Sequence, residues 1–339
     1  MPFITENENL QQPTLQSYIS NRESEKVRRL AKSYPDEQVF EINNAFNIIE
    51  DTGIKAGSII GFDAETPIRT KPQLQQMLVS LSKIAHAHHY TEEELYKYFN
   101  PRSEAESLKI IQDAFMSINA LDEGIEDTKE YIRAQMTYNG KLELEDPKSQ
   151  VKIGFEFDLP EETFMQSNDF ASDDVNPIEV LEQLVERYQE NNNQTAPAYM
   201  VMNRKTYNKI RRNKNVVAQL YGNASDGRLV RNEDMETMFA DFGLPTLEID
   251  DNVTIIEGLT EDIRHKHLED DKVVMHAEQL GNTLIGPAAD NNFAIGKYVV
   301  NVQDRDPISE KTIVGEVTIP VLKNPKGVVI LEAKGNDTP

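Results

Sequence analysis

Histidine and carboxylate side chains are the residues of this sequence that could do chemistry, and three histidines stand closest together. His86, His88 and His89 occur within HAHHY. If this segment is a helix, His86 and His89 share a face and could begin a metal site. The residue one turn after His86 is Tyr90 rather than a carboxylate, so we favour the interpretation that these histidines end a helix, where partial positive charge is stabilising. We interpret His265 and His267, in IRHKHLEDD, in the same way, as part of a polar loop.

Three acidic groups could support acid–base catalysis or hold Ca²⁺. They are Asp173-Asp174, Asp250-Asp251 and Glu269-Asp270-Asp271. None has the spacing of an EF-hand loop. Two of the groups lie at predicted turns, and Asp173-Asp174 precedes a helix start, where negative charge is stabilised by the helix itself. Local structure therefore accounts for all three without a catalytic role.

The sequence also lacks the short motifs of common catalytic and cofactor sites. It contains no GxGxxG, GxxxxGK[ST], HExxH or GxSxG. There is no cysteine, which excludes disulfides, thiolate metal sites and cysteine nucleophiles. We therefore predict that the protein is not an enzyme and uses no cofactor or metal ion.

The chain is strongly acidic. Its 339 residues include 35 Lys and Arg against 58 Asp and Glu, which gives a net charge of −23. That charge argues against unaided binding to nucleic acid or to an anionic membrane, and it favours cationic partners. No signal peptide is evident, and the apolar runs are too short to span a membrane. The length predicts about two domains.

Positive charge is concentrated in one place, between Arg204 and Lys214. A basic helix of this kind could contact nucleic acid, but it lacks interleaved aromatic residues apart from Tyr207. In a protein of this charge we favour contact with an acidic neighbour, including another copy of the chain, or a solvated face.

The first hundred residues combine polar stretches with short apolar pieces. Residues 1–35 are predicted to form a mobile polar arm with a short helix near 23–33. Strands and an extended loop near 53–72 follow. Residues 73–87 are predicted to be helical because apolar residues recur at helical spacing. Thr91 and Glu94 form a capping box that opens a further short helix.

A long amphipathic helix is the strongest local prediction. Its apolar stripe continues for about 36 residues from Pro101, a rod of roughly 54 Å, longer than a typical compact domain is wide. Ser103 is its predicted cap. The helix ends at Asn139-Gly140, after which two strands are predicted, with a turn at Asp146-Pro147.

The remaining sequence alternates between helices and strands. Residues 173–176 are predicted to cap a helix that begins at Pro177, followed by the buried strand AYMVMN and the basic helix. Further strands are predicted in six segments: 246–250, 253–257, 272–276, 293–302, 315–319 and 327–332. The pattern is that of an α+β protein in which residues 175–290 form a separate module.

The order of these parts resembles the major capsid protein of tailed phages (Caudoviricetes). The resemblance is to the lambda-like branch called the phage capsid protein E family, which has the Hong Kong 97-type fold. The segments that carry it are Arg133–Leu142 (RAQMTYNGKL), Met202–Leu220 (MNRKTYNKIRRNKNVVAQL), Val273–Gly286 (VVMHAEQLGNTLIG) and Pro320–Ala333. In this fold the long helix is the spine of the subunit, which would explain a rod longer than a domain.

The resemblance implies a shell subunit made of five parts. These are an N-terminal arm (1–35), an extended-loop region with helices (36–100), a peripheral domain with the spine helix and long strands (101–174), an axial domain (175–290) and return strands of the peripheral domain (291–339). The extended loop would lie over a neighbouring subunit, and the axial domain would meet its copies at five-fold and six-fold axes.

The function implied is self-assembly into an icosahedral virion shell that encloses double-stranded DNA. The partners implied are other copies in pentamers and hexamers, a separate scaffolding protein, portal and decoration proteins, and packaged DNA bound without sequence specificity, with no membrane partner. Assembly would take place in the host cytoplasm. The residues expected to contact neighbouring subunits are Lys55, Arg69, Lys71, Arg204, Arg211 and Arg212.

Three other functions remain open from the sequence. An encapsulin-like compartment would use the same fold to enclose a cargo enzyme. A soluble α/β enzyme would be a small oligomer with one deep pocket. A tail-tube protein would be richer in strands and would lack the spine helix.

Overall fold

The computed structural model of this protein describes residues 10–22, 24, 26–49, 74–99, 101–148, 151–156, 159–222, 230–258 and 260–334. The chain divides into two compact units. Unit 1 comprises residues 1–45, 78–131 and 282–321, and unit 2 comprises residues 46–77, 132–281 and 322–339. The chain passes between the units several times, and each unit has a sheet and an apolar core of its own.

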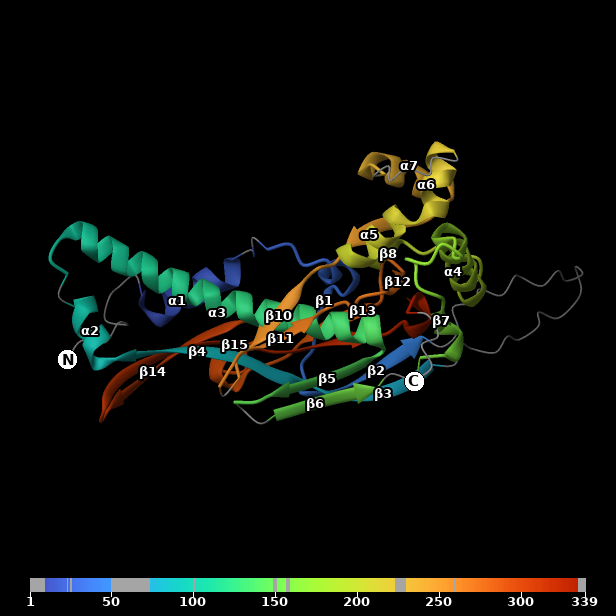
Figure 1. Ribbon diagram of the computed structural model, residues 1–339. Coiled ribbons are helices and arrows are strands. Elements are labelled where there is room, and N and C mark those ends of the chain that lie inside the picture. The colour runs from blue at the N-terminus through green and yellow to red at the C-terminus, as the bar shows by residue number, and fades with distance from the viewer. Residues whose placement is uncertain are drawn as a thin grey trace, which may run out of the picture. The chain divides into compact units, whose positions relative to one another are not determined.

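Unit 1 is organised around one long strand, β15 (Ile308–Leu322). Antiparallel strands β14 (Tyr298–Arg305) and β4 (Ser82–Thr91) pair with it. The same sheet continues through β13 (Gly281–Ile285) to the short strand β1 (Asp36–Gln38), which is parallel to β13. Helices α1 (Gln12–Asn21), α2 (Glu92–Phe99) and α3 (Glu104–Asn139) supply the rest of this unit's core (Figure 1).

The predicted long helix is confirmed as α3, which has 36 residues. Ser103 accepts a hydrogen bond from the Glu106 amide at 3.2 Å, as expected of its cap. The helix ends before Gly140, whose φ of 67° lies in the left-handed region. A side chain at Gly140 would also collide with Leu159, so both backbone conformation and space require glycine here.

The helix predicted over residues 73–87 is wrong. These residues lie in β3 (Leu74–Ser80) and β4. β3 pairs with β2 (Asn43–Ile49), and β4 pairs along ten residues with β15. A spacing of three and four is compatible with both structures over so short a segment, and the long partner strand decides in favour of a sheet. The capping box at Thr91 is confirmed: its amide donates to Glu94 at 2.9 Å.

The N-terminal segment also differs from the prediction of a mobile arm. Its helix, α1, begins at Gln12, before the predicted helix at 23–33, and it buries Leu15 and Ile19 against α3, β14 and β15. A single turn, η3 (Leu30–Ser33), follows. The sequence did not predict this packing because its apolar residues are few. Two buried side chains are nevertheless enough to hold a ten-residue helix against a larger core.

Unit 2 contains a five-stranded sheet in the order β7–β16–β12–β8–β9. The strands are β7 (Phe164–Gln166), β16 (Val328–Glu332), β12 (Lys272–His276), β8 (Tyr199–Met202) and β9 (Thr246–Ile249). The central strand β12 is antiparallel to both of its neighbours, β16 and β8. The edge strands are parallel to theirs, β7 to β16 and β9 to β8. The central strands are almost wholly buried, which explains their continuous apolar sequences.

Four helices complete the core of unit 2: α4 (Pro177–Asn191), α5 (Arg204–Arg212), α6 (Lys214–Tyr221) and α7 (Asn232–Asp241) (Figure 1). Asn176 caps α4 as predicted. The unit also carries two ribbons, β5 (Lys141–Asp146) with β6 (Val151–Glu156) and β10 (Val253–Ile256) with β11 (Ile263–Lys266). Single turns lie at η4 (Glu161–Thr163) and η6 (Pro325–Gly327), and unit 1 has one more at η5 (Ala289–Asn291).

Candidate functional site

The basic segment folds into two helices rather than one, and asparagine residues fix both. Asn203 caps α5 by accepting from the Thr206 amide at 2.8 Å. Asn213 separates the helices and caps α6 by accepting from the Asn215 amide at 2.8 Å. Its own amide group donates to the carbonyl of Phe170 at 2.9 Å. Both caps are buried, so α5 is held rigidly with its basic face toward solvent.

The acidic groups noted in the sequence converge on this basic helix. Each comes from a different loop of unit 2, and each meets a lysine or arginine of α5 or α6. The pairs are Arg204–Asp251 at 3.1 Å, Lys205–Asp270 at 2.7 Å, Lys209–Asp271 at 2.6 Å, Lys209–Asp169 at 3.0 Å and Lys214–Asp173. The acidic neighbour predicted for the basic helix is therefore present within the same chain.

The electrostatics of this cluster keep its members ionised. A hydrogen bond from Lys205 lowers the pKa of Asp270. Burial alone would lower the pKa of Lys209, but its bonds to Asp271 and Asp169 outweigh burial and raise it. Carboxylates and ammonium groups shifted in these directions hold their charges at neutral pH, so the cluster is suited to electrostatic contact rather than to proton transfer.

A cavity of about 740 Å³ opens beside α5. Its lining includes five cationic side chains and two carboxylates: Arg204, Lys205, Lys209, Arg212, Lys266, Asp251 and Asp270. Asparagine side chains of α5 and of the loop before β10 complete it. We call this cavity the α5 pocket. Its wall presents many hydrogen-bond donors, which favours an acidic or carbonyl-rich ligand over an apolar one.

The contact residues expected from the sequence have different positions. Lys55, Arg69 and Lys71 lie outside the described residues. Arg204 and Arg212 are exposed at the α5 pocket. The guanidinium of Arg211 instead donates to the Val230 carbonyl at 2.5 and 3.1 Å and lies over the ring of Tyr207, so it fastens α5 within its own unit.

Asp250 has a structural role that the sequence did not reveal. It is buried, and the hydroxyl of Tyr138, near the end of α3, donates to it at 2.9 Å. Adjacent Asp251 is exposed and pairs with Arg204. One residue of this acidic pair therefore anchors the last turn of α3 in unit 2, while the next faces the α5 pocket.

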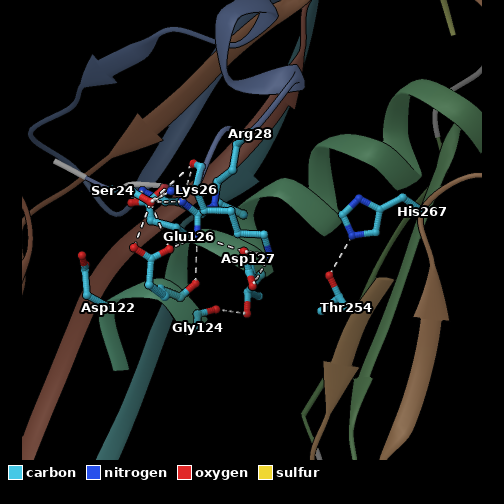
Figure 2. A network of polar contacts seen from close by, with 12 residues as sticks. Ser24, Lys26, Arg28, Asp122, Gly124, Glu126, Asp127, Thr254 and His267 are labelled. Carbon is cyan, nitrogen blue, oxygen red and sulfur yellow. Dashed lines mark hydrogen bonds and ion pairs between the residues drawn. The ribbon is translucent and has the colours of Figure 1, made fainter. Parts of the chain in front are cut away.

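Unit 1 contains a second charged cluster, between α3 and the segment after α1. We call residues 22–28 the N-terminal strap. Arg22 donates to Asp122 at 2.5 Å and to Glu123 at 2.6 Å, and Arg28 donates to Glu123 at 2.6 Å and to Asp127 at 2.9 Å (Figure 2). Both arginines are largely buried. The strap therefore neutralises the acidic face of α3 midway along the helix.

The remaining charges of this cluster connect α3 with β14 and β15. Lys129 contacts Glu126 at 2.6 Å and Glu316 at 2.8 Å, and Lys297 contacts Glu126 at 2.9 Å and Asp122 at 2.7 Å. Burial opposes ionisation of Glu126, but Lys129 and Lys297 outweigh it and lower its pKa to about 2. Burial raises the pKa of Glu316, and Lys129 offsets only part of that effect.

The histidines do not lie at a helix end. β4 places His86 and His88 on one face of the sheet and His89 on the other. The His86 ring lies against Gly124 of α3, which gives that mid-helix glycine a packing role. His267 is not in a polar loop: it is buried, with a ring nitrogen 2.7 Å from the Thr254 hydroxyl (Figure 2). Across the described residues, no group of three or more His, Asp or Glu could hold a metal ion.

No helix among the residues that the structure describes is long and apolar enough to cross a membrane. The described surface includes the α5 pocket and scattered exposed apolar side chains such as Phe40 and Tyr96. Paired charges, a rigid basic helix and a long amphipathic rod are suited to contact between proteins.

Comparison with protein families supports that interpretation. The model of the family described as phage major capsid protein E matches residues 49–333. No curated protein matches the chain.

Solved structures share the fold. A phage-related protein from Bordetella bronchiseptica RB50 is similar over 96% of this chain and 98% of its own, with 12% identity and a TM-score of 0.57. A putative capsid protein of a prophage of E. coli CFT073 is similar over 90% of this chain and 92% of its own, with 13% identity and a TM-score of 0.56. At such identities the likeness shows the fold alone.

Proposed function

This chain belongs to the phage major capsid protein E family, and we propose that its copies form rings of five and six subunits that close into an icosahedral shell around double-stranded DNA. As a member of that family it is a major capsid protein, a structural component of the phage head. The observation that carries the proposal is the family match over 49–333, which includes all of α3, the α5 pocket and every strand of the two five-stranded sheets except β1.

The long helix suits a subunit that must contact many neighbours. α3 begins in unit 1 and ends in unit 2, and at its length it forms a rod of roughly 54 Å. A shell can then be stabilised by several modest contacts for each subunit rather than by one large interface. The strap at mid-helix and the Tyr138–Asp250 bond at its end support this role, because they fix the rod within each unit.

We assign the two units to the two domains of the capsid fold. Unit 1, with β15 and most of α3, would be the peripheral domain. Unit 2, with the five-stranded sheet and α4–α7, would be the axial domain that meets its copies at five-fold and six-fold axes. Residues 53–72, with Lys55, Arg69 and Lys71, would form the loop that lies over a neighbouring subunit.

The proposed partners follow from this assembly. A separate scaffolding protein would direct closure of the shell in the host cytoplasm, and portal and decoration proteins would join it. Packaged DNA would be enclosed without sequence-specific contacts, since a net charge of −23 disfavours adhesion to phosphates. We assign the chain no catalytic role, because it belongs to a family of structural proteins.

Particle size tests the proposal. The chain should be expressed alone and with the scaffolding candidate encoded beside it, and then analysed by light scattering and negative-stain microscopy. Rings of five and six or closed shells are expected, and dependence on the scaffold would favour a phage head over a cargo compartment. A co-purified cargo enzyme would support the compartment, and a stable monomer or dimer under both conditions would refute assembly.

A further inference from the structure

The α5 pocket is a cavity with mostly cationic charged side chains, in the unit that we assign to the ring axes, and none of the described residues fills it. We propose that it receives the acidic face of α7 from a second copy of this chain, so that neighbouring copies of unit 2 join head to tail. This inference rests on the proposed ring assembly and specifies its contact.

The pocket has one uncompensated charge. Four of its five cations already pair with carboxylates of the same chain. The fifth, Arg212, is exposed, and its side chain makes no hydrogen bond or ion pair with any residue in the described ranges. Arg204 and Lys205 remain well exposed despite their partners, with side chains 69% and 63% accessible. A carboxylate that enters the pocket therefore meets Arg212 first, with two more cations within the same cavity.

The acidic face of α7 offers the complementary charges. Glu233, Glu236 and Asp241 are exposed on this helix, and their side chains have no ion pair or hydrogen bond to another part of the chain that the structure describes. The opposite face of α7 buries Met235 and Phe239 in the core of unit 2. The helix is thus rigid, and among the described residues these three carboxylates form no ion pair or hydrogen bond with another part of the chain.

The pocket and the start of α7 both adjoin α5. Arg204, Asn208 and Arg212 recur every four residues and line the pocket. Arg211 binds the carbonyl of Val230, the residue that leads into α7. Within the part of the chain that the structure describes, Glu233, Glu236 and Asp241 form no ion pair with the cations of their own pocket. Contact between unlike surfaces of successive copies is the geometry that closes a ring.

Apolar groups beside the pocket match the end of α7. On the β10–β11 ribbon, Val253 and Ile255 are 42% and 56% exposed, and they share a face with Lys266, which lines the pocket. Phe242 directly follows α7 and is 40% exposed. The carboxylates of α7 therefore match the cations of the α5 pocket, and Phe242 after α7 matches the apolar face of the β10–β11 ribbon beside that pocket.

Charge reversal and its rescue test the contact in the full-length chain. Arg212→Glu should raise the protein concentration needed for half-maximal assembly by about tenfold or more, because like charges then meet at every copy of the contact. Lys109→Glu is the matched control: this exposed lysine of α3 makes no ion pair or hydrogen bond through its side chain with any described residue, and it undergoes the same change of charge. Combining Arg212→Glu with Glu233→Arg and Glu236→Arg should restore assembly. Equal assembly of wild type and Arg212→Glu would overturn the inference.

Cross-linking identifies the occupant, and the absence of cysteine makes the chain suitable for it. With a short bismaleimide, Arg212→Cys combined with Glu236→Cys should give a ladder of covalent oligomers that ends at the ring size. Either single variant alone should give no ladder, and a mixture of the two single variants should give dimers. As a control, Glu186→Cys on α4 replaces Glu236→Cys. A ladder from this control, or cross-links only within single chains of the variant with Arg212→Cys and Glu236→Cys, would refute the assignment of α7 to the pocket.

The two proposals can fail separately. If wild-type protein forms rings or shells but the variant with Arg212→Cys and Glu236→Cys gives no ladder, the α5 pocket has another occupant and the capsid function stands. If wild-type protein forms no assembly with or without scaffold, the proposed assembly fails, and the pocket contact fails with it.

Discussion

The buried pair between Lys129 and Glu316 offers a sharp test of how unit 1 is held together. Lys129 lies on α3 and Glu316 on β15, and each side chain is 3% exposed. Lys129→Met removes the positive charge while keeping most of the side-chain volume. Glu126, the other partner of Lys129, retains Lys297 at 2.9 Å, so the loss falls mainly on Glu316.

The magnitude follows from what remains after the substitution. Burial already raises the pKa of Glu316, and Lys129 is the main group that opposes this effect. Removing one partner of a buried pair typically destabilises a protein by about 3–5 kcal/mol, because the other charge stays buried without compensation. Replacing both residues, as in Lys129→Met with Glu316→Leu, should return the free energy of unfolding to within about 1–2 kcal/mol of wild type.

Hydrogen exchange on the unassembled subunit is the appropriate assay, since the chain has two units and need not unfold in a single step. Exchange at amides near Lys129 and Glu316 should accelerate in the single variant and recover in the double variant. Lys109→Met, the same change at an exposed position of α3, should alter local stability by less than about 0.5 kcal/mol.

The pH dependence supplies a second readout. A carboxyl whose pKa is raised by folding stabilises the protein below its unfolded pKa, and that contribution is lost as pH rises through its folded pKa. The deficit of Lys129→Met should therefore be smaller at about pH 5 than at pH 8. A deficit that does not depend on pH, or a double variant as unstable as the single one, would refute the reasoning.

Four further outcomes are expected. Gly140→Ala should lower the free energy of unfolding of unit 2 by about 2–3 kcal/mol, because the new side chain is strained at this φ and overlaps Leu159. Gly243→Ala has the same φ of 67° but open space around it, so it should lower the free energy of unfolding by only about 1 kcal/mol. Both values can be measured by denaturation followed by circular dichroism. Tyr138→Phe should cost about 1–3 kcal/mol, because Asp250 is left buried without its donor. Folding lowers the pKa of Glu126 to about 2, so its ionised form stabilises the folded protein. That stabilisation should be complete at pH values above the pKa of Glu126 in the unfolded chain and should vanish as pH falls through about 2. Acid unfolding of wild type compared with Glu126→Gln measures it. Assembled shells should bind DNA weakly even at low salt, and tight binding in a filter assay would contradict the proposal that the net charge of −23 disfavours adhesion to DNA.

The long helix could be predicted from sequence because its signal accumulates over many turns. An apolar stripe continued through 36 residues, bounded by Ser103 and Gly140, has no plausible alternative as a strand. The segment around His86 could not be predicted in the same way. It is short, and its conformation is set by pairing with β15, more than 200 residues later in the chain.

The α5 cluster shows the same division between local and distant information. The sequence revealed the basic helix and the acidic groups separately, and local rules explained each of them. It could not show that Asp169, Asp251 and Asp270 arrive from separate loops at one helix, because folding alone brings them together. Nor could it show that Arg212 has no side-chain partner among the described residues, while the guanidinium of Arg211 binds a carbonyl within unit 2.

Electron cryo-microscopy of particles purified after co-expression with the scaffolding protein tests the central claim most directly. The account predicts closed shells in which every subunit has this fold, arranged in rings of five and six with unit 2 nearest the axes. Particles that lack this chain, or a chain that purifies only as a monomer or dimer beside them, would contradict it.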